Sequence, residues 1–252
     1  MNQNLGVIIE QPQPSGVGKF LFRNPMRDWL PFEPNAEWQL LNHVDVMACV
    51  SYSLCHIIET QIFFLTGKKV DLSERFLAKM SKTTRQGNYL SVVADTALEG
   101  LVMQDEWPVD PNATWDEFYS EIPQAIKNKA LDFKKNWDMS WRWITFDQIT
   151  DALKEAPIQI IINNNTHAVE LVNSTTYFDS YAPFNKPFSA ATYFLLFTIN
   201  PKNMNQTKLV LSKDGHTVYR CEPIATTFDD LKAQMGVIGV EIPNPIPPSS
   251  SL

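Results

Sequence analysis

The sequence has few cysteines and no cysteine pair of the kind that binds structural zinc. Its three cysteines, Cys49, Cys55 and Cys221, are too few for a disulfide framework. No C-x-x-C motif occurs and the four histidines are scattered, which argues against a structural metal site. We therefore expect a reducing compartment and neither a metal nor another cofactor. In such a compartment a free thiol is either buried packing or a nucleophile.

Charge and hydropathy argue against a nucleic-acid-binding protein and against a membrane-spanning protein. The formal net charge is -7, and no cluster of Lys and Arg is long enough to follow a phosphate backbone, so we expect no nucleic-acid partner. The longest apolar stretches, 57–65 and 193–199, are too short to span a membrane. The first residues lack the basic and apolar regions of a secretory signal. These absences favour a cytoplasmic or virion-borne protein, acting in the host cytoplasm if a phage encodes it, without membrane contact.

The 252 residues fit one substantial domain and a small appendage. Residues 1–36 read as an irregular arm that five prolines interrupt. Residues 37–200 form the main domain, and residues 205–252 form an appendage of a hairpin, a short helix and a disordered tail. Helical periodicity dominates up to Pro157, and β-branched runs dominate after it. Because helices precede strands instead of alternating with them, the fold class is α+β.

Hydrophobic spacing, capping residues and turn residues predict the elements of both parts. The predicted helices cover 49–66, 73–80, 92–99, 115–136 (in two pieces around Pro123), 145–156 and 227–235. The predicted strands cover 158–162, 167–172, 176–181 and 191–199, with a second hairpin over 208–222. Trp141 and Trp143 alternate with polar residues as strand residues do.

Cys49 stands at the start of the first long predicted helix. The free N–H groups and the positive dipole end of a helix N-terminus favour a thiolate, as does a neighbouring imidazolium. Together they lower a cysteine pKa from ~8.5 to roughly 3.5–7.5. The alternative is that Cys49 is a small buried apolar residue, which is the commoner role of an intracellular cysteine.

The predicted hairpin after residue 166 brings a histidine and a carboxylate together. If residues 173–175 form its loop, Asp179 lies diagonally across from His167 on the same face. If residues 172–174 form the loop, the two are directly opposed. Either register leaves the side chains within reach. A carboxylate on one imidazole nitrogen fixes the tautomer and leaves the other nitrogen free for proton transfer.

These residues resemble the papain-like cysteine peptidases. In that family an aromatic residue, a serine and a glutamate follow the active cysteine at fixed spacing, as Tyr52, Ser53 and Glu59 follow Cys49. Further matching segments occur in the family's order: Leu72-Ser73-Glu74, Gln86-Gly87-Asn88-Tyr89, His167-Ala168-Val169 and Asp179-Ser180-Tyr181.

The resemblance implies a papain-like fold, with the nucleophile helix in a helical N-terminal half and a β-rich C-terminal half. It also implies a Cys49–His167–Asp179 triad that cleaves peptide or isopeptide bonds of a protein or peptide through an acyl-enzyme. Gly87 and Asn88 would bind the substrate backbone. Tyr181 would shield the His–Asp pair and line the substrate site.

The departures from the family concern the oxyanion hole and the segment before the nucleophile. The family's oxyanion glutamine lies six residues before the cysteine, where this chain has His43 beside Asn42. Either side chain could donate to an oxyanion, and the choice stays open. Aspartate replaces the family's asparagine at position 179. Only 48 residues precede Cys49, fewer than a helical inhibitory propeptide needs.

Two other functions stay open beside a peptidase. In transglutaminase-like enzymes and amidases the third member of the catalytic triad is commonly an aspartate. Asp179 therefore also fits an acyl-transfer enzyme that is not a peptidase. His43 at the glutamine position also fits an inactive papain-fold binding module. The sequence does not predict an oligomeric state.

Overall fold

The computed structural model describes residues 6–10, 28–163, 165–202, 209–211 and 218–220. The chain divides into two units, Met1–Lys202 and Asn203–Leu252. In the second unit, β7 (Leu209–Leu211) and β8 (Val218–Arg220) form an antiparallel pair within the hairpin predicted over 208–222. The predicted helix over 227–235 lies outside the described residues. The domain boundaries expected at 36 and 205 remain predictions.

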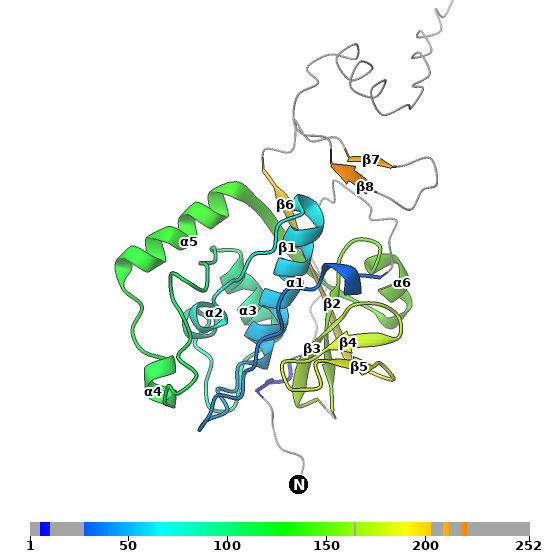
Figure 1. Cartoon of the computed structure of the whole chain (residues 1–252). Helices are drawn as coiled ribbons and strands as arrows, with labels where there is room; N and C mark the ends of the chain where they lie inside the picture. The colour runs from blue at the N-terminus through cyan, green and yellow to red at the C-terminus, as the bar shows by residue number, and fades with distance from the viewer. Residues whose placement is uncertain (1–5, 11–27, 164, 203–208, 212–217, 221–252) are drawn as a thin grey trace, which may run out of the picture. The chain divides into compact units, whose positions relative to one another are not determined.

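The first unit combines helices with an antiparallel sheet, so the α+β prediction is confirmed (Figure 1). Its helices are η1 (Leu30–Phe32), α1 (Cys49–Thr66), α2 (Glu74–Met80), α3 (Leu90–Ala97), α4 (Trp115–Phe118), α5 (Gln124–Asn136), η2 (Phe146–Gln148) and α6 (Ile149–Ala152). Its strands are β1 (Trp137–Ile144), β2 (Ile158–Ile162), β3 (His167–Leu171), β4 (Thr176–Phe178), β5 (Asn185–Pro187) and β6 (Tyr193–Pro201). In Figure 1, α1 stands between the other large helices and the sheet.

Helix α1 has the bounds that the sequence predicts. It ends because Gly67 adopts a left-handed conformation, with φ of 68°, and donates its N–H to the Phe63 carbonyl. Every residue from 49 to 62 is buried. A helix that is buried all round belongs in the interior, and α1 packs against α2 and α3 on one side and against β2, β3 and β6 on the other.

The sheet has the strand order β1-β6-β2-β3-β4-β5, and all its pairs are antiparallel. Strand β2 is buried throughout because each of its faces meets a different apolar cluster. Ile161 packs with residues of α1, whereas Ile160 packs with residues of α6 and η1. This double burial explains why the sequence IQIII lacks the polar alternation of a strand with one wet face.

Several predicted elements differ in extent from the observed ones. The predicted helix over 115–136 is in two pieces around Pro123, as predicted, but residues 119–123 between α4 and α5 are not helical. The predicted strand over 176–181 ends at Phe178, although the Asp179 N–H still donates to the Phe184 carbonyl of the β5 side at 2.8 Å. Trp141 and Trp143 lie on β1, as their alternation predicts.

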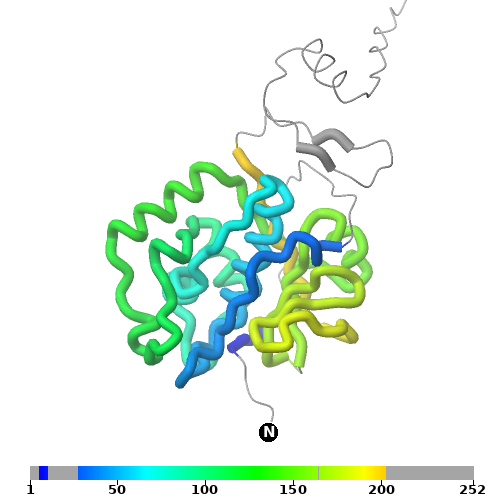
Figure 2. Tube along the Cα trace, viewed as in Figure 1, coloured from blue at the N-terminus to red at the C-terminus, as the bar shows by residue number. Residues whose placement is uncertain are grey.

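A short segment near the N-terminus lies against the loop that precedes α3. The Asn88 N–H donates to the Gly6 carbonyl at 3.0 Å, and the Ile8 N–H donates to the Asn88 carbonyl at 2.7 Å. These bonds form a parallel bridge between Val7 and Asn88. Glu10 accepts from the Ser91 N–H at 2.9 Å. Figure 2 shows this segment, in dark blue, entering beside the start of α1.

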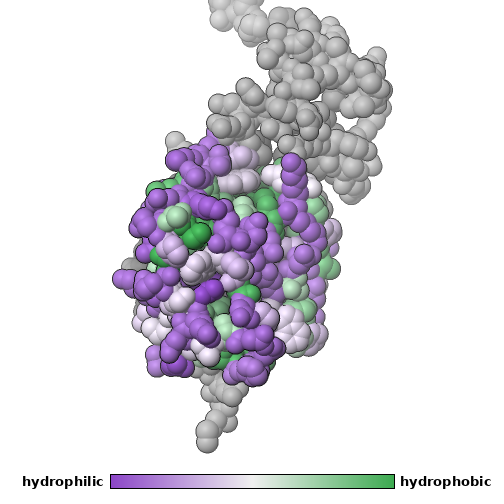
Figure 3. All heavy atoms as spheres, turned by 60° about the vertical axis from the view of Figure 1, so that its left-hand side comes forward, coloured by the Kyte–Doolittle hydropathy of each residue, from purple (hydrophilic) through white to green (hydrophobic). Residues whose placement is uncertain are grey.

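The helical side of the unit, which Figure 3 brings forward, is mostly polar with small apolar patches between polar side chains. Among the described residues no helix is long and apolar enough to cross a membrane.

Candidate active site

Cys49 is the first residue of α1, and its thiol is enclosed. The residue is 0% exposed, and its Sγ accepts a hydrogen bond from the Ala168 N–H at 3.4 Å. That bond joins the start of α1 to β3. Val7 of the N-terminal segment belongs to the same apolar cluster as Cys49 and Ala168.

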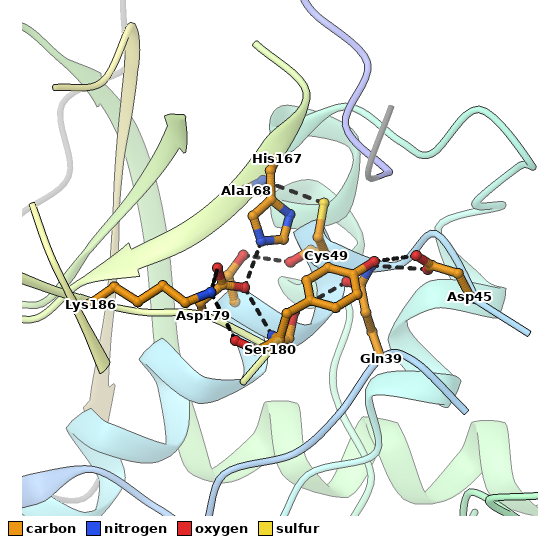
Figure 4. Close-up of polar contacts among 10 residues, drawn as sticks. Gln39, Asp45, Cys49, His167, Ala168, Asp179, Ser180 and Lys186 are labelled. Atoms are coloured by element: carbon orange, nitrogen blue, oxygen red, sulfur yellow. Dashed lines mark hydrogen bonds and ion pairs between the residues drawn. The ribbon is translucent and has the colours of Figure 1, made fainter. Parts of the chain in front are cut away.

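The β3–β4 hairpin places His167 and Asp179 as the first of the two predicted registers requires. Leu171 pairs with Tyr177, which leaves residues 173–175 as the loop. The His167 Nε2 and the Asp179 Oδ1 lie 2.7 Å apart, and both residues are buried. The other ring nitrogen, Nδ1, has no hydrogen-bond partner and faces Cys49 in Figure 4. The structure therefore brings together the three side chains that the sequence singled out.

Asp179 is held by donors on both of its oxygens. Oδ1 accepts from the Tyr181 N–H at 2.9 Å in addition to His167, and Oδ2 accepts from the Lys186 Nζ at 2.7 Å. Burial raises the pKa of this carboxyl, but the hydrogen bonds from His167, Lys186 and Tyr181 outweigh burial and hold the pKa below its usual value. Asp179 is therefore an anion at neutral pH, and the Nε2 of His167 carries the proton between them.

The thiol of Cys49 is not activated in this enclosed state. Burial raises the pKa of Cys49 to about 12, and the nearby carboxylates of Asp45 and Asp179 add to that rise. The N–H groups of Ala168 and Val50 lower it by less. The expected low pKa at a helix N-terminus is thus absent here, because the dipole and the donors are outweighed by the loss of water.

Asn88 binds an extended backbone, which is the chain's own segment at Gly6–Ile8, whereas the Gly87 N–H and carbonyl both bond to Thr84. Gly87 has φ of 95°, and a Cβ there would meet the Gly6 carbonyl at 2.0 Å. The Asn88 side chain instead supports the loop, because its Nδ2 donates to the Ser81 carbonyl at 2.9 Å.

The candidates for the oxyanion hole do not join this group of contacts. Asn42 and His43 are both exposed, and the Asn42 Nδ2 donates to the Asn112 Oδ1 at 2.7 Å. Gln39 is fully buried and donates to the Tyr181 hydroxyl, and Figure 4 draws it with Cys49 among the residues of the site. A glutamine therefore reaches the site from ten positions before the cysteine instead of six.

Gln39 is fixed by a polar network that the sequence analysis missed. Its Oε1 accepts from the Ser180 Oγ at 3.2 Å. Its Nε2 donates to the Asp45 Oδ1 at 3.1 Å and to the Tyr181 hydroxyl. Tyr181 in turn donates to the Asp45 Oδ2. Tyr181 also lies against the His167 ring, with 5.3 Å between the ring centroids, so it covers the His–Asp pair as expected. Allowing a longer loop before the cysteine would have found Gln39 in the sequence.

A second histidine and a second thiol on α1 lie outside this site. His56 is buried, pairs through its Nδ1 with Glu170 and stacks on the Phe178 ring at 3.5 Å between centroids. Cys55 is 0% exposed, and burial raises its pKa well above the usual value. Both have the packing roles that their positions suggested. In the part of the chain that the structure describes, no group of three or more His, Cys, Asp or Glu residues could hold a metal ion.

Comparisons with known proteins agree on the architecture. No protein-family model matches the chain, and no curated protein sequence matches it. Among solved structures, the chain resembles the Amb a 11 cysteine protease, a ragweed pollen allergen in its proform, with a TM-score of 0.50 and 15% identity. That match covers 69% of this chain and 66% of the other, slightly under two thirds of that protein's length.

Two other solved structures give the same result. Digestive procathepsin L 3 of the Tenebrio molitor larval midgut matches with a TM-score of 0.50 and 14% identity, covering 78% of this chain and 75% of the other. The recombinant stem bromelain precursor matches with a TM-score of 0.50 and 12% identity, covering 68% and 69%. At these identities the likeness concerns the fold. The chain therefore has the fold of the papain-like cysteine proteases.

Proposed function

We propose that the chain is a thiol-dependent peptidase that cleaves peptide or isopeptide bonds of a protein substrate. The observation that carries the proposal is the arrangement around His167. One ring nitrogen binds the anionic Asp179, and the other is unpartnered, buried and faces the thiol of Cys49. This is the geometry in which an imidazole takes a proton from a nucleophile and later returns it.

The proposed reaction uses two steps at one carbonyl carbon. The Cys49 Sγ attacks the carbonyl while its proton passes to the His167 Nδ1, and Asp179 stabilises the resulting imidazolium. Collapse of the tetrahedral intermediate breaks the C–N bond, and His167 gives its proton to the leaving amine. A water molecule then attacks the thioester, its proton passing to His167, and releases the carboxylic acid and the thiol.

Gln39 is the side-chain donor that we propose for the oxyanion. It is buried, and its two Nε2 hydrogens go to Asp45 and Tyr181, so one of these bonds must give way for the Nε2 to donate to the oxyanion. One such donor contributes ~2.7–4 kcal/mol to barrier lowering in a known protease. We expect Gln39→Ala to lower turnover of a fluorescent casein by roughly 10²–10³. Alkylation of Cys49 by iodoacetamide should change little, because alkylation forms no oxyanion.

Asn42 and His43 provide the matched controls for Gln39. Both lie close to it in sequence but are exposed, so Asn42→Ala and His43→Ala should keep the parent's turnover. Loss of turnover in either variant, with Gln39→Ala unaffected, would contradict this assignment.

The enclosed thiol implies that substrate enters only when residues 6–10 leave the site. The segment occupies the backbone groups of Asn88 and packs in the cluster that includes Cys49. An epoxysuccinyl probe, which alkylates active thiols, tests this point. Deleting residues 1–10 should raise the labelling rate of Cys49 at least about tenfold, because rehydration lowers the thiol pKa toward its usual value.

Deleting residues 1–5 alone provides the control, since it keeps every described contact of 6–10. Equal labelling of Cys49 in both deletions and the full chain would contradict the blocking role of the segment. No labelling of Cys49 in any of the three would favour the inactive binding module. Incorporation of an amine without peptide cleavage would favour the transglutaminase-like alternative, which the aspartate at position 179 supports.

A further inference from the structure

Lys186 contacts the proposed triad without belonging to it. It lies on β5 opposite Tyr177, and Asp179 follows Tyr177 by two residues on the same face, so the lysine and the carboxylate are diagonal neighbours. The Lys186 Nζ donates to the Asp179 Oδ2 at 2.7 Å and to the Tyr181 carbonyl at 3.0 Å. Its side chain is 23% exposed, whereas that of Asp179 is 4% exposed. In Figure 4 the lysine approaches Asp179 from the side away from Cys49.

Three donors converge on the two oxygens of residue 179. His167 and the Tyr181 N–H donate to Oδ1, and Lys186 donates to Oδ2. An asparagine has one oxygen and one NH₂ group in the same places. With its oxygen toward His167, its NH₂ would face the ammonium of Lys186. With its oxygen toward Lys186, its NH₂ would face two N–H donors. Either orientation leaves donors facing donors in a buried place, which is costly.

We infer that Lys186 is a positioning residue that makes aspartate the required third member of the triad. It fixes the carboxylate with Oδ1 toward His167, and its positive charge balances the carboxylate. The ion pair then presents to the imidazole an acceptor with little net charge, as a neutral amide would. This inference rests on the proposed triad, but its geometric part, the orientation of His167 by residue 179, can be measured without turnover.

The test combines four variants of the full chain: Lys186→Met, Lys186→Arg, Asp179→Asn and the double variant D179N/K186M. In Asp179→Asn the donor conflict should displace His167 and lower Cys49 labelling by the epoxysuccinyl probe about 10²–10⁴-fold, as a wrong tautomer does. Removing the lysine as well relieves the conflict, so the double variant should label at least about tenfold faster than Asp179→Asn. Lys186→Met alone should label more slowly than the parent, and Lys186→Arg should restore most of the rate.

A spectroscopic measurement separates positioning from folding. In protein labelled with ¹⁵N-histidine, the Nε2–H signal of neutral His167 should be sharp and hydrogen-bonded in the parent. It should be lost or shifted in Asp179→Asn and regained in the double variant. Lys79→Met is the matched control, because Lys79 is 25% exposed and also pairs with a carboxylate, Glu121, at 2.9 Å. This variant should leave both readouts unchanged.

Two results would overturn the inference. One is an Asp179→Asn variant that keeps the parent's Nε2–H signal, and the other is a double variant no better than Asp179→Asn in either measurement. If Cys49 reacts with the probe neither in the parent nor after deletion of residues 1–10, the proposed peptidase fails. The histidine signals of the four variants still decide the role of Lys186.

Discussion

Buried carboxylates behave in opposite ways in two regions of the molecule. After β4, Asp179 is 3% exposed, and hydrogen bonds from His167 and Lys186 outweigh burial and lower its pKa. At the start of α2, Glu74 is 2% exposed and its pKa is raised well above the usual value. Burial by itself raises the pKa of the carboxyl group in both regions. The partners decide the outcome, because Asp179 meets cationic and neutral donors and Glu74 meets other carboxylates.

The region at α2 has four acidic side chains: Glu59 and Glu74 are buried, Glu37 is half-buried and Asp71 is exposed. Burial raises the pKa of Glu37 to about 7, because it outweighs the lowering by the hydrogen bond with Glu74, and the charge on Asp71 adds a lesser rise. Glu59 accepts from the Leu72 N–H, yet burial keeps its pKa well above the usual value. The comparison teaches that a buried carboxyl group is ionised at neutral pH only where hydrogen-bond donors surround it.

The largest expected difference between the regions is in catalysis. Asp179→Ala leaves His167 without its orienting acceptor, and we expect turnover to fall by as much as ~10⁴. Glu37→Gln removes a carboxylate from the other region and should leave turnover unchanged. Steady-state cleavage of a fluorescent casein by both variants measures the contrast. Equal turnover of Asp179→Ala and the parent would remove Asp179 from the mechanism.

The next effect concerns stability and pH. Because folding raises the pKa of Glu37 from 4.5 to about 7, its contribution to stability is fully present below pH 4.5 and is lost as the pH rises through 7. Glu37→Gln, which cannot ionise, should raise the melting temperature at pH 8 by about 2–4 °C, the shift that ~1 kcal/mol gives in a domain of this size. The gain should disappear near pH 4.5. Thermal melts of variant and parent at several pH values test this sign, and a gain that grows with acidity would contradict it.

The smallest effect is expected at an exposed carboxylate. Glu121 pairs with Lys79 on the surface, and that hydrogen bond and charge lower its pKa. Because water and salt screen such a pair, Glu121→Gln should leave both the melting temperature and turnover unchanged. Its melts in the same pH series provide the baseline for Glu37→Gln. A pH-dependent shift as large as that of Glu37→Gln would remove the distinction between half-buried and exposed acids.

The sequence predicted the fold well where a local signal was strong. Helix α1 has its predicted bounds because apolar spacing and Gly67 mark both its interior and its end. Strand β2 has its predicted bounds because Pro157 and the following asparagines flank a β-branched run. Helix α3 begins at Leu90 instead of Val92, since the exact helix start depends on contacts that spacing does not encode.

The site was partly predictable for a similar reason. The sequence pointed to Cys49, His167 and Asp179 because each is a chemically reactive residue type and lies near the end of a predicted helix or strand. Gln39 was missed because the loop before α1 is longer than the family spacing. Lys186 was missed because a lone lysine in a loop-rich stretch has no pattern, and only the β4–β5 pairing brings it to Asp179.

The sequence by itself determined the α+β class, the helix that begins with Cys49 and the hairpin that joins His167 to Asp179. These features follow from periodicity, turn residues and side-chain chemistry, which are local properties. The tertiary structure alone decided which side chains surround these groups. It brought Gln39 and Lys186 to the site and laid residues 6–10 over the loop at Asn88. Burial then set the protonation of Cys49, because the cost of removing a charge from water depends on every neighbour that excludes the water.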